Sequence, residues 1–192
     1  MTSTSKSPTA VRAILLLALA SLAGCGAGPE SEQDPAMYLY AGGRDGGGTG
    51  GSSGSPIMNN GNVTQSSTAF GGIAERATDG NTDGNFWNGS VSHTDYQFFP
   101  FWQTETRPEF PGKVTIHRRT DCCPEQLGTF RLSFYSLSAN TWLDVGTYDL
   151  GTQNRLEVPI TNPTFWGRIG AVRITKLDWG YLTLAEVTVE RF

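Results

Sequence analysis

The segment "KVTIHRRTDCCPEQLGTFRLSFY", residues 113–135, joins two runs of alternating apolar and polar side chains through an unusual pair of adjacent cysteines. The apolar positions of the two runs are Val114 and Ile116, then Phe130, Leu132 and Phe134. A period of two is typical of β-strands that bury one face. We therefore predict two strands, separated by a turn that contains Cys122 and Cys123.

Similar patterns extend over the region from Pro56 to Phe192. "RLEVPI" (residues 155–160) alternates in the same way, and "AVRITKL" (residues 171–177) is expected to bury Val172, Ile174 and Leu177. Clusters of Gly, Pro, Asn and Asp separate the runs, and no stretch here keeps a helical period for three turns. These features predict an all-β domain over residues 56–192, an antiparallel sandwich or barrel.

One strand-like run breaks its own alternation. In "YLTLAEVTVE", residues 181–190, Leu182, Leu184 and Glu186 would share a face, but the apolar series continues at Val187 and Val189. The shift predicts a β-bulge near Ala185 and Glu186. If Glu186 turns inward there, its carboxylate needs a partner, and a cation would serve.

The N-terminus has the features of a secretory signal. Residues 1–12 carry Lys6 and Arg12 and no acidic residue, and "AILLLALASLAG" follows at residues 13–24. This apolar run is shorter than the roughly 20 residues that a transmembrane helix needs. The segment is therefore expected to direct export.

The end of that run, "LAGC" at residues 22–25, resembles a bacterial lipobox. The resemblance implies a signal peptide over residues 1–24 and a lipid anchor on Cys25, which holds the chain at a membrane. An ordinary cleaved signal that happens to contain a cysteine is the alternative. Gly26, and not aspartate, follows the cysteine. If the source is a Gram-negative bacterium, this favours anchoring in the outer membrane of the cell envelope over retention in the inner membrane.

Residues 25–55 are predicted to be a disordered, flexible tether, since they are rich in Gly and Ser and poor in apolar residues. The whole chain has a formal net charge of −4, with 14 basic and 18 acidic side chains. This balance argues against a nucleic-acid partner and against binding to an anionic surface by charge alone. The oligomeric state cannot be predicted from these features.

The loop "RATDGNTDGNFWNGSVSH", residues 76–93, is rich in oxygen-bearing side chains. Asp79, Asn81, Asp83 and Ser90 offer hard ligands of the kind that calcium prefers, although the spacing is not that of an EF-hand. On residue types alone, an ordinary turn of Asp, Asn and Gly is the favoured interpretation.

Polar residues around the cysteine pair suggest a second site. His93, Arg119 and Asp121 suit the recognition of vicinal hydroxyls or a carboxylate. Arg118 is instead expected to be an exposed loop charge, and His117 a surface residue of its strand.

The cysteine pair has several interpretations. Zinc would need two further ligands close by, and a thiol oxidoreductase would need Cys-x-x-Cys spacing, so both are disfavoured. Export to an oxidising compartment favours a disulfide between Cys122 and Cys123. Pairing between two molecules remains an alternative.

Taken together, the motifs "NVTQSSTAFGGIAERATDGNTDGNF", "GSVSHT", "PFWQTET" and "KVTIHRRTDCCPEQL" resemble the F-type lectin (fucolectin) domain. The resemblance extends over about residues 61–192 and is most specific at "RTDCCPE". It implies a discoidin-like jelly roll of about eight strands that binds fucose, with a structural calcium ion. Such a protein would be a lectin and not an enzyme, since no nucleophile–base pair or catalytic metal motif is present.

The family's functional residues map onto this chain position by position. The resemblance implies that His93 and Arg119 contact the sugar, that Asp121 orients Arg119, and that a Cys122–Cys123 disulfide packs against the sugar ring. Phe86, Trp87 and Tyr96 are candidates for an additional stacking surface. The implied calcium ligands are the side chains of Asp79, Ser90 and Glu186 and the carbonyls of Arg76, Asn81 and Ala185.

The chain departs from the family pattern at two places. A long-range disulfide of some members is replaced by Val91 and Ala185, which we expect to pack together beside the calcium. The family's second basic sugar contact falls at Gln126, which lacks a charge. The loss of one charged hydrogen bond would cost about 1–2 kcal/mol, or roughly ten-fold in affinity. Arg118 and Arg107 are the nearby basic residues that would replace it.

Two functions therefore compete. The first is a surface-displayed lectin for fucose or a related glycan. The second is a discoidin-fold module with a degenerate sugar pocket, which binds a protein or serves the envelope; Gln126 favours this alternative.

Overall fold

The computed structural model describes residues 56–165 and 167–192. The predicted signal peptide over residues 1–24, the proposed lipid anchor at Cys25 and the predicted tether over residues 25–55 lie outside these residues. Within the described part of the chain, no helix combines the length and the apolar character needed to cross a bilayer.

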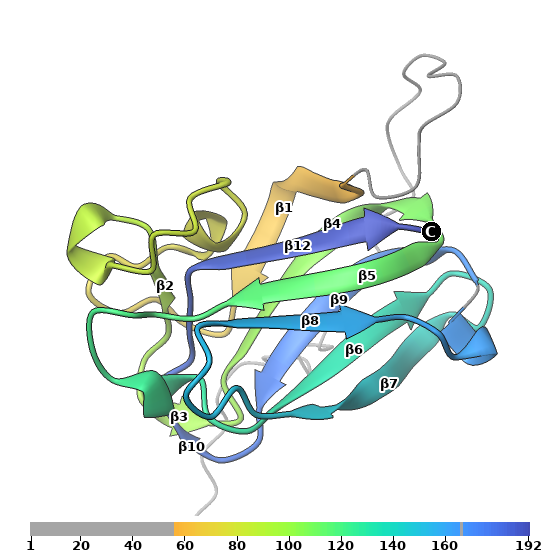
Figure 1. Cartoon of the computed structure of the whole chain (residues 1–192). Coiled ribbons are helices and arrows are strands. Elements are labelled where there is room, and N and C mark those ends of the chain that lie inside the picture. Colours follow the sequence, from red (N-terminus) through yellow and green to blue (C-terminus); the bar gives the residue numbers. More distant parts are fainter. Residues whose placement is uncertain (1–55, 166) are drawn as a thin grey trace, which may run out of the picture. The chain divides into compact units, whose positions relative to one another are not determined.

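Eight longer strands form two antiparallel sheets that pack face to face as a β-sandwich (Figure 1). The larger sheet has the order β1 (Met58–Gln65), β4 (Phe101–Glu109), β9 (Ile169–Lys176), β6 (Phe130–Ser136) and β7 (Thr141–Tyr148). The smaller sheet has the order β12 (Glu186–Arg191), β5 (Pro111–His117) and β8 (Arg155–Pro159). The predicted all-β sandwich of antiparallel sheets is thus confirmed.

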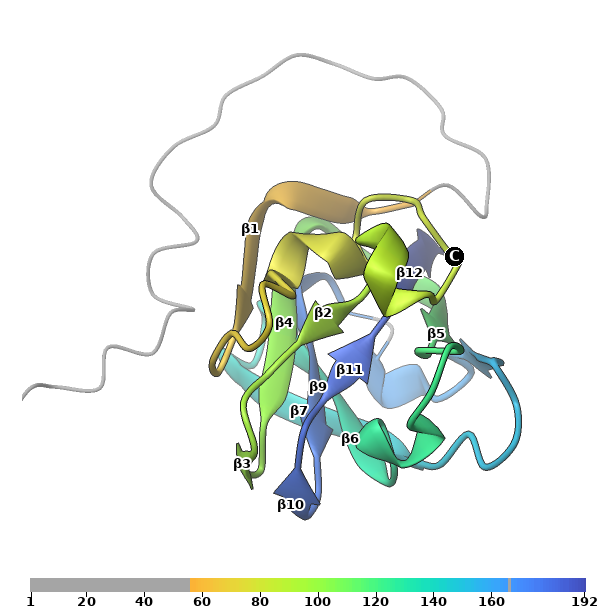
Figure 2. The same cartoon turned by 90° about the vertical axis from the view of Figure 1, so that its left-hand side faces the viewer.

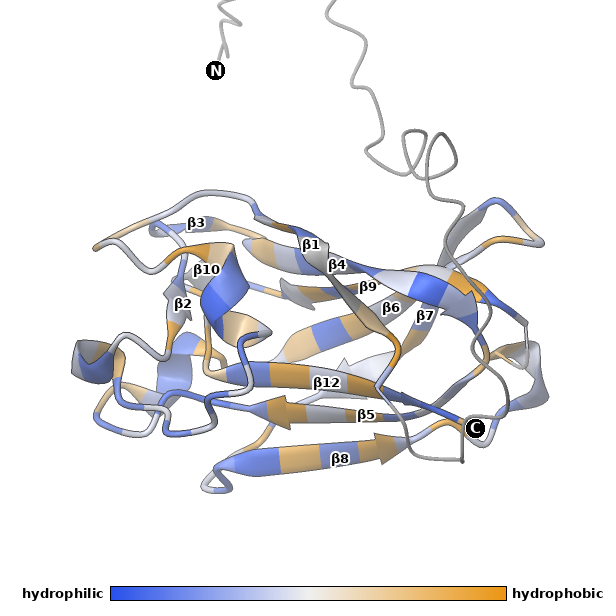
Figure 3. Cartoon of the chain, turned by 90° about the horizontal axis from the view of Figure 1, so that it is seen from above, coloured by the Kyte–Doolittle hydropathy of each residue, from blue (hydrophilic) through white to orange (hydrophobic). Residues whose placement is uncertain are grey.

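The core lies between these two layers, which are seen edge-on in Figure 3. The predicted inward residues of the first two runs are all fully buried: Val114, Ile116, Phe130, Leu132 and Phe134. Trp102 of β4 is buried among them, and its indole Nε1 donates to the Ala74 carbonyl oxygen at 2.9 Å. Burial of these apolar surfaces is the main source of the domain's stability.

Short elements gather at one end of the sandwich, on the left in Figure 1 and away from the C-terminus, and Figure 2 looks directly onto this end. They are the strand pairs β2 (Ser92–His93) with β11 (Thr183–Leu184) and β3 (Gln97–Phe98) with β10 (Trp179–Gly180), and the 3-10 helices η2 (Ala74–Ala77), η3 (Phe86–Asn88) and η4 (Pro124–Gln126). A further 3-10 helix, η5, spans Pro163–Phe165. Loops at the end of a rigid sandwich commonly carry binding sites.

The alternation break in residues 181–190 is real, but its form differs from the predicted bulge. The chain leaves β11, which pairs with β2, and enters β12, which pairs with β5. Ala185 lies between the two strands, and its N–H donates to the His117 carbonyl oxygen at 2.9 Å. The shift therefore marks a change of sheet, and it turns Glu186 inward.

Two predictions, the inward position of Leu177 and the exposure of Arg118, were wrong. Lys176, and not Leu177, continues the buried face of Val172 and Ile174, because its ammonium reaches carbonyl oxygens beneath the surface. Arg118 is buried, and its guanidinium donates to Gly151 O at 2.8 Å and to Thr152 O at 3.1 Å. It stabilises the 151–154 turn and is not an exposed loop charge.

Candidate functional site

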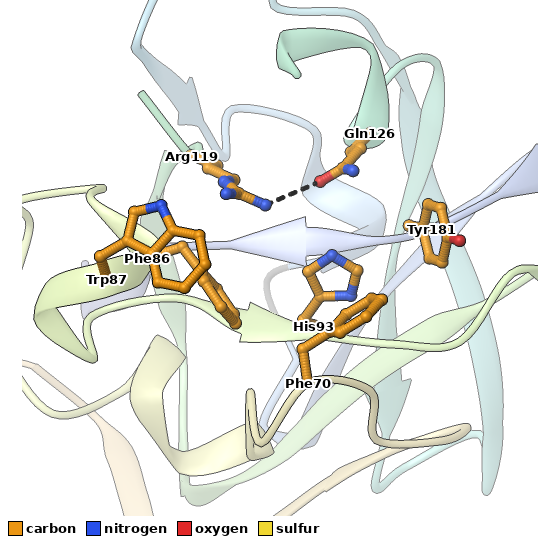
Figure 4. Close-up of a pocket in the computed structure, with 7 residues that line it drawn as sticks. All are labelled: Phe70, Phe86, Trp87, His93, Arg119, Gln126 and Tyr181. Atoms are coloured by element: carbon orange, nitrogen blue, oxygen red, sulfur yellow. Dashed lines mark hydrogen bonds between the residues drawn. The ribbon is translucent and has the colours of Figure 1, made fainter. Parts of the chain in front are cut away.

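A cavity of about 510 Å³ opens at the loop end of the sandwich (Figure 4). Its lining residues come from four separate segments of the chain: Phe70, Phe86, Trp87, His93, Arg119, Gln126 and Tyr181. Four aromatic rings thus surround an imidazole, a guanidinium and an amide. A mostly apolar cavity with a few converging polar groups is typical of a small-molecule site.

His93 lies on β2 at the floor of this cavity and is 2% exposed. Its Nδ1 lies 2.8 Å from the Thr94 carbonyl oxygen. Because a carbonyl can only accept, Nδ1 carries the hydrogen, and Nε2 of the neutral ring is an acceptor. In Figure 4 this second nitrogen points toward Arg119 and Gln126.

Burial lowers the pKa of the His93 imidazole below its ordinary value. The hydrogen bond to Thr94 opposes this shift, and the positive charge of Arg119 adds to it. The ring is therefore neutral at pH 7 and offers Nε2 as an acceptor to a ligand hydroxyl.

Arg119 is held by a two-point contact with Asp121. Its Nε lies 2.7 Å from Oδ1, and its Nη2 donates to Oδ2 at 2.8 Å. The hydrogen bonds from Arg119 lower the pKa of Asp121 to about 2, so the pair stays ionised. The guanidinium carbon also lies 4.8 Å from the centre of the Phe86 ring, which fixes the plane of the fork further.

Asp121 also joins two segments of the site. Its Oδ1 accepts a hydrogen bond from the Phe86 backbone N–H at 3.2 Å. Nearby, the Thr120 backbone N–H donates to the Gly84 carbonyl oxygen at 2.8 Å. Through these contacts Asp121 holds Arg119 in position and ties the loop of Phe86 to the cysteine turn.

The adjacent cysteines form a disulfide with each other. Cys123 has a left-handed backbone conformation, with φ of 57°, and begins the 3-10 helix η4, at whose end Gln126 lies. Both cysteines are half-buried, and they do not contribute to the lining of the cavity. In this structure the disulfide shapes the turn beside the cavity.

Gln126 lines the cavity, with its Oε1 3.4 Å from the Arg119 Nη1. This bond leaves the two N–H donors of the amide unused. Neither Arg118 nor Arg107 lines the cavity, so neither replaces the missing basic group. The third polar group of the cavity, after His93 and Arg119, is therefore the uncharged amide of Gln126.

Lys176 was missed as a supporting residue of the site. Its Nζ donates to Glu125 O at 3.0 Å and to Leu127 O at 3.4 Å, on either side of Gln126. Gly128 has φ of 54° and leaves room for this ammonium, since a side chain there would collide with it. A pattern within one short stretch of sequence cannot indicate such a contact, because the two partners lie about 50 positions apart.

Two aromatic walls were also missed. The rings of Phe70 and Tyr181 lie 5.1 Å and 5.0 Å from the His93 ring, measured between centroids. Of the predicted stacking candidates, Phe86 and Trp87 line the cavity, whereas Tyr96 lies behind Tyr181, 5.4 Å from it.

Two of the predicted metal ligands, Asp79 and Glu186, lie near each other. Glu186 is 6% exposed, and its Oε2 accepts a hydrogen bond from the Gly80 backbone N–H at 3.1 Å. Burial raises the pKa of its carboxyl to about 7; the Gly80 bond opposes this rise, and the Asp79 carboxylate adds to it. Two carboxylates are thus brought together with one of them buried.

Other residues of the predicted calcium region are also buried. Ser90 is fully buried, and its hydroxyl donates to the Asn85 carbonyl oxygen at 2.9 Å, which leaves its oxygen lone pairs for a ligand. Val91 and Ala185, where some relatives carry cysteines, are also fully buried. The described residues contain no group of three or more His, Cys, Asp and Glu side chains placed for a metal, so hydroxyl and carbonyl oxygens would have to complete the site.

No family model matches the chain. Fucolectin-5 of Anguilla japonica is 37% identical to it over 138 residues, which cover 67% of this chain and 72% of that relative. The chain belongs to the F-type lectin (fucolectin) family. This F-type lectin spans 62–65% of the length of three other fucolectins of Anguilla japonica.

Solved structures agree with this assignment. A fucose binding module of Streptococcus pneumoniae is 31% identical to this F-type lectin with a TM-score of 0.61, covering 72% of this chain and 98% of that one. The lectin domain of lectinolysin, complexed with Lewis B antigen, is 31% identical with a TM-score of 0.61, covering 68% of this chain and 92% of that one. The prediction of an F-type lectin domain is therefore confirmed.

Proposed function

We propose that this F-type lectin binds L-fucose, within fucosylated or related glycans, in the cavity of His93, Arg119 and Gln126. One observation carries the proposal: a neutral imidazole acceptor and a fixed guanidinium donor converge on one aromatic-walled cavity. Sugar hydroxyls both donate and accept, so neighbouring hydroxyls can satisfy Nε2 of His93 and the fork of Arg119 together. The aromatic rings suit the apolar face and methyl group of a 6-deoxy sugar.

Titration calorimetry with L-fucose tests the proposal, and the variant Gln126→Arg makes the test sharper. The natural protein is expected to bind L-fucose with a Kd between millimolar and micromolar, that is, about −4 to −8 kcal/mol. Gln126→Arg is expected to raise the affinity roughly ten-fold, because it replaces a neutral donor by a charged one. Gln126→Ala is the matched control and should weaken binding.

The same experiment decides for or against the second candidate function, a module with a degenerate sugar pocket. The observation in its favour is the contact of the Gln126 amide with Arg119, which occupies one donor of the guanidinium. If the folded, calcium-loaded natural protein binds no L-fucose and Gln126→Arg does, the degenerate pocket is correct. If neither protein binds, the cavity is not a fucose site.

His93 gives this binding a defined pH dependence. Because the pKa of His93 is lowered, its ring stays neutral from pH 8 down to about 6.5, and affinity should be constant over that range. Below the lowered pKa of His93, protonation turns Nε2 from an acceptor into a donor next to Arg119, and the affinity for L-fucose should fall several-fold. The control His117→Gln, which removes the chain's other histidine, should keep this profile. An unchanged Kd at a pH where NMR shows the His93 ring to be protonated would contradict the role of His93.

We also propose a structural Ca²⁺ ion. The carboxylates of Asp79 and Glu186 and the hydroxyl of Ser90 would hold it, together with the carbonyl oxygens of Arg76, Asn81 and Ala185. Its charge would stabilise the two neighbouring carboxylates and link the 76–90 loop to β12. The support for this proposal is the burial of Glu186 beside Asp79.

Display of the domain on a bacterial envelope is the remaining part of the proposal. A lipid on Cys25 and a tether over residues 25–55 would hold the lectin at the membrane, with the outer membrane favoured. Membrane fractionation of the Cys25→Ser variant tests this part, because the variant should be lost from the membrane fraction. Recovery of the variant with the membranes would rule the lipid anchor out.

A further inference from the structure

Two side chains of the proposed fucose cavity, Gln126 and Tyr181, lie on the same side of it (Figure 4), although they come from distant parts of the chain. Gln126 ends the 3-10 helix η4, and Tyr181 follows the short strand β10. A side chain that contacts both segments would set the spacing of these two walls. Lys176 is such a side chain.

Lys176 is the last residue of β9 and is buried, with 3% of its surface exposed. Its backbone N–H donates to the Pro100 carbonyl oxygen at 2.9 Å, which fixes the point where the side chain starts. Lysine is almost never this deeply buried unless its ammonium has partners. The side chain does not line the cavity, so these partners belong to the protein.

The ammonium of Lys176 holds the turn that carries Gln126. Its Nζ donates to Glu125 O at 3.0 Å and to Leu127 O at 3.4 Å, on either side of Gln126. These carbonyls lie at the C-terminal end of η4, where a lysine side chain can satisfy the last acceptors of a helix. Hydrogen bonds from a charged donor are about twice as strong as neutral ones. The two bonds therefore fix the backbone on both sides of Gln126.

The methylene stem of Lys176 packs against the segment that carries Tyr181. Gly180, directly before Tyr181, leaves room for the stem, since a Cβ there would lie 2.7 Å from the Lys176 Cε. Asp178 of the same segment accepts an ion-pair contact from Nζ at 3.2 Å. On the side of η4, Gly128 leaves room for the ammonium in the same way. Lys176 thus passes between two glycines, one in each segment.

We propose that Lys176 is a positioning residue for sugar binding, which holds the Gln126 amide at the distance from Tyr181 that a bound fucose needs. The inference rests on the proposed fucose site. Gln126 has a short side chain and no charge, and a hydrogen bond weakens steeply when its geometry is lost. The amide therefore depends on its backbone being held, and Lys176 supplies that hold without touching the sugar.

A double-mutant cycle with L-fucose as the probe tests this role. Lys176→Met keeps the stem and approximate volume of the side chain and removes the ammonium, so it should weaken binding about three- to five-fold. In the Gln126→Ala background the same change should alter the Kd by less than about two-fold, because the group that Lys176 positions is already gone. Lys176→Gln keeps a neutral donor and should give an intermediate Kd; it carries the test if Lys176→Met does not fold.

Hydrogen exchange measures the hold on the turn without any sugar. In free Lys176→Met, the backbone amides of residues 123–128 should exchange faster, and the core strands should keep their rates. Lys113→Met is the matched control, since Lys113 also makes ion pairs, with Glu157 and Glu190, but lies on β5 and does not line the cavity. It should change neither the affinity for L-fucose nor exchange in residues 123–128.

The outcomes separate the role of Lys176 from the fucose site itself. Thermal unfolding should first show that each variant is folded at the temperature of the titration. If L-fucose binds but Lys176→Met keeps the natural Kd, or loses the same factor with and without the Gln126 side chain, the positioning role is wrong while the fucose site stands. Unchanged exchange in residues 123–128 would overturn it as well. If the natural protein binds no L-fucose, the fucose proposal fails and the role of Lys176 in binding fails with it.

Discussion

Replacing Arg119 with alanine is expected to weaken binding of L-fucose by 100-fold or more, beyond detection by calorimetry. Arg119 is the only permanently charged donor in the lining of the cavity, and Asp121 fixes its fork at two points. Hydrogen bonds from charged groups are about twice as strong as neutral ones. Loss of charged hydrogen bonds to two sugar hydroxyls corresponds to about 3 kcal/mol or more of binding free energy.

Two further variants separate charge from geometry at this position. Arg119→Lys keeps the charge but loses the planar fork, so it should recover only part of the affinity. Asp121→Asn keeps Arg119 but releases it, and an intermediate loss is expected. Arg119→Ala also removes the contact with Phe86, so circular dichroism and thermal unfolding must show that it folds at the temperature of the titration. A folded Arg119→Ala protein with the natural Kd would exclude the cavity as the fucose site.

The sequence was most informative where neighbouring residues decide the structure. Alternation in residues 130–134 identified the inner face of β6, and the residue types around the cysteines grouped Arg119 and Asp121 in one candidate site. Residues this close in the chain constrain each other locally, so one sequence suffices to detect them. His93 lies 26 positions from Arg119; residue type alone placed it in the same candidate set, and the family resemblance gave it a role in sugar binding.

The missed residues all depend on contacts between distant segments. Phe70 and Tyr181 reach the cavity because the loop after β1 and the chain before β11 return to the same end of the sandwich. Arg118 appeared to be a loop charge because its acceptors, in the 151–154 turn, follow more than 30 positions later. An alternating pattern predicts which face of a strand is buried. It does not predict which distant segment of the chain packs against the end of that strand.

Glu186 shows how an anomaly in the pattern can be informative. Its inward direction conflicted with the alternation of its run, and the structure explains this by the change of sheet at Ala185. Burial of the Glu186 carboxylate beside Asp79 disfavours its charged form. Among the described contacts that shift its pKa, only the hydrogen bond from the Gly80 N–H favours that charged form. This imbalance is the physical basis of the last prediction.

Removal of calcium with EGTA is expected to lower the Tm of the domain by about 8 °C or more. A ligand present at 100 times its Kd stabilises the folded state by about 2.7 kcal/mol. For a domain of this size, each kcal/mol corresponds to roughly 3–5 °C in Tm. Differential scanning fluorimetry with calcium and with EGTA measures the shift, and magnesium should substitute poorly because it demands a tighter octahedral geometry.

The variant Glu186→Gln tests the site itself. It should abolish the calcium-dependent shift in Tm, and without calcium it should be at least as stable as the natural protein, because the amide removes the repulsion between the two carboxylates. Glu190→Gln is the matched control: it lies on the same strand but pairs with Lys113, 3.3 Å away, and should keep the full shift. Equal Tm values for the natural protein in calcium and in EGTA would exclude a stabilising ion.

Calcium removal should also reach the sugar site, because the two sites share a loop. The 76–90 segment carries Asp79 and Ser90 as well as Phe86 and Trp87, which form two walls of the cavity. Once its link to Glu186 is lost, that segment depends on the Phe86–Asp121 and Thr120–Gly84 hydrogen bonds to stay in place. EGTA should therefore weaken L-fucose binding at a temperature where the domain is still folded, whereas Glu186→Gln should show one affinity with and without calcium.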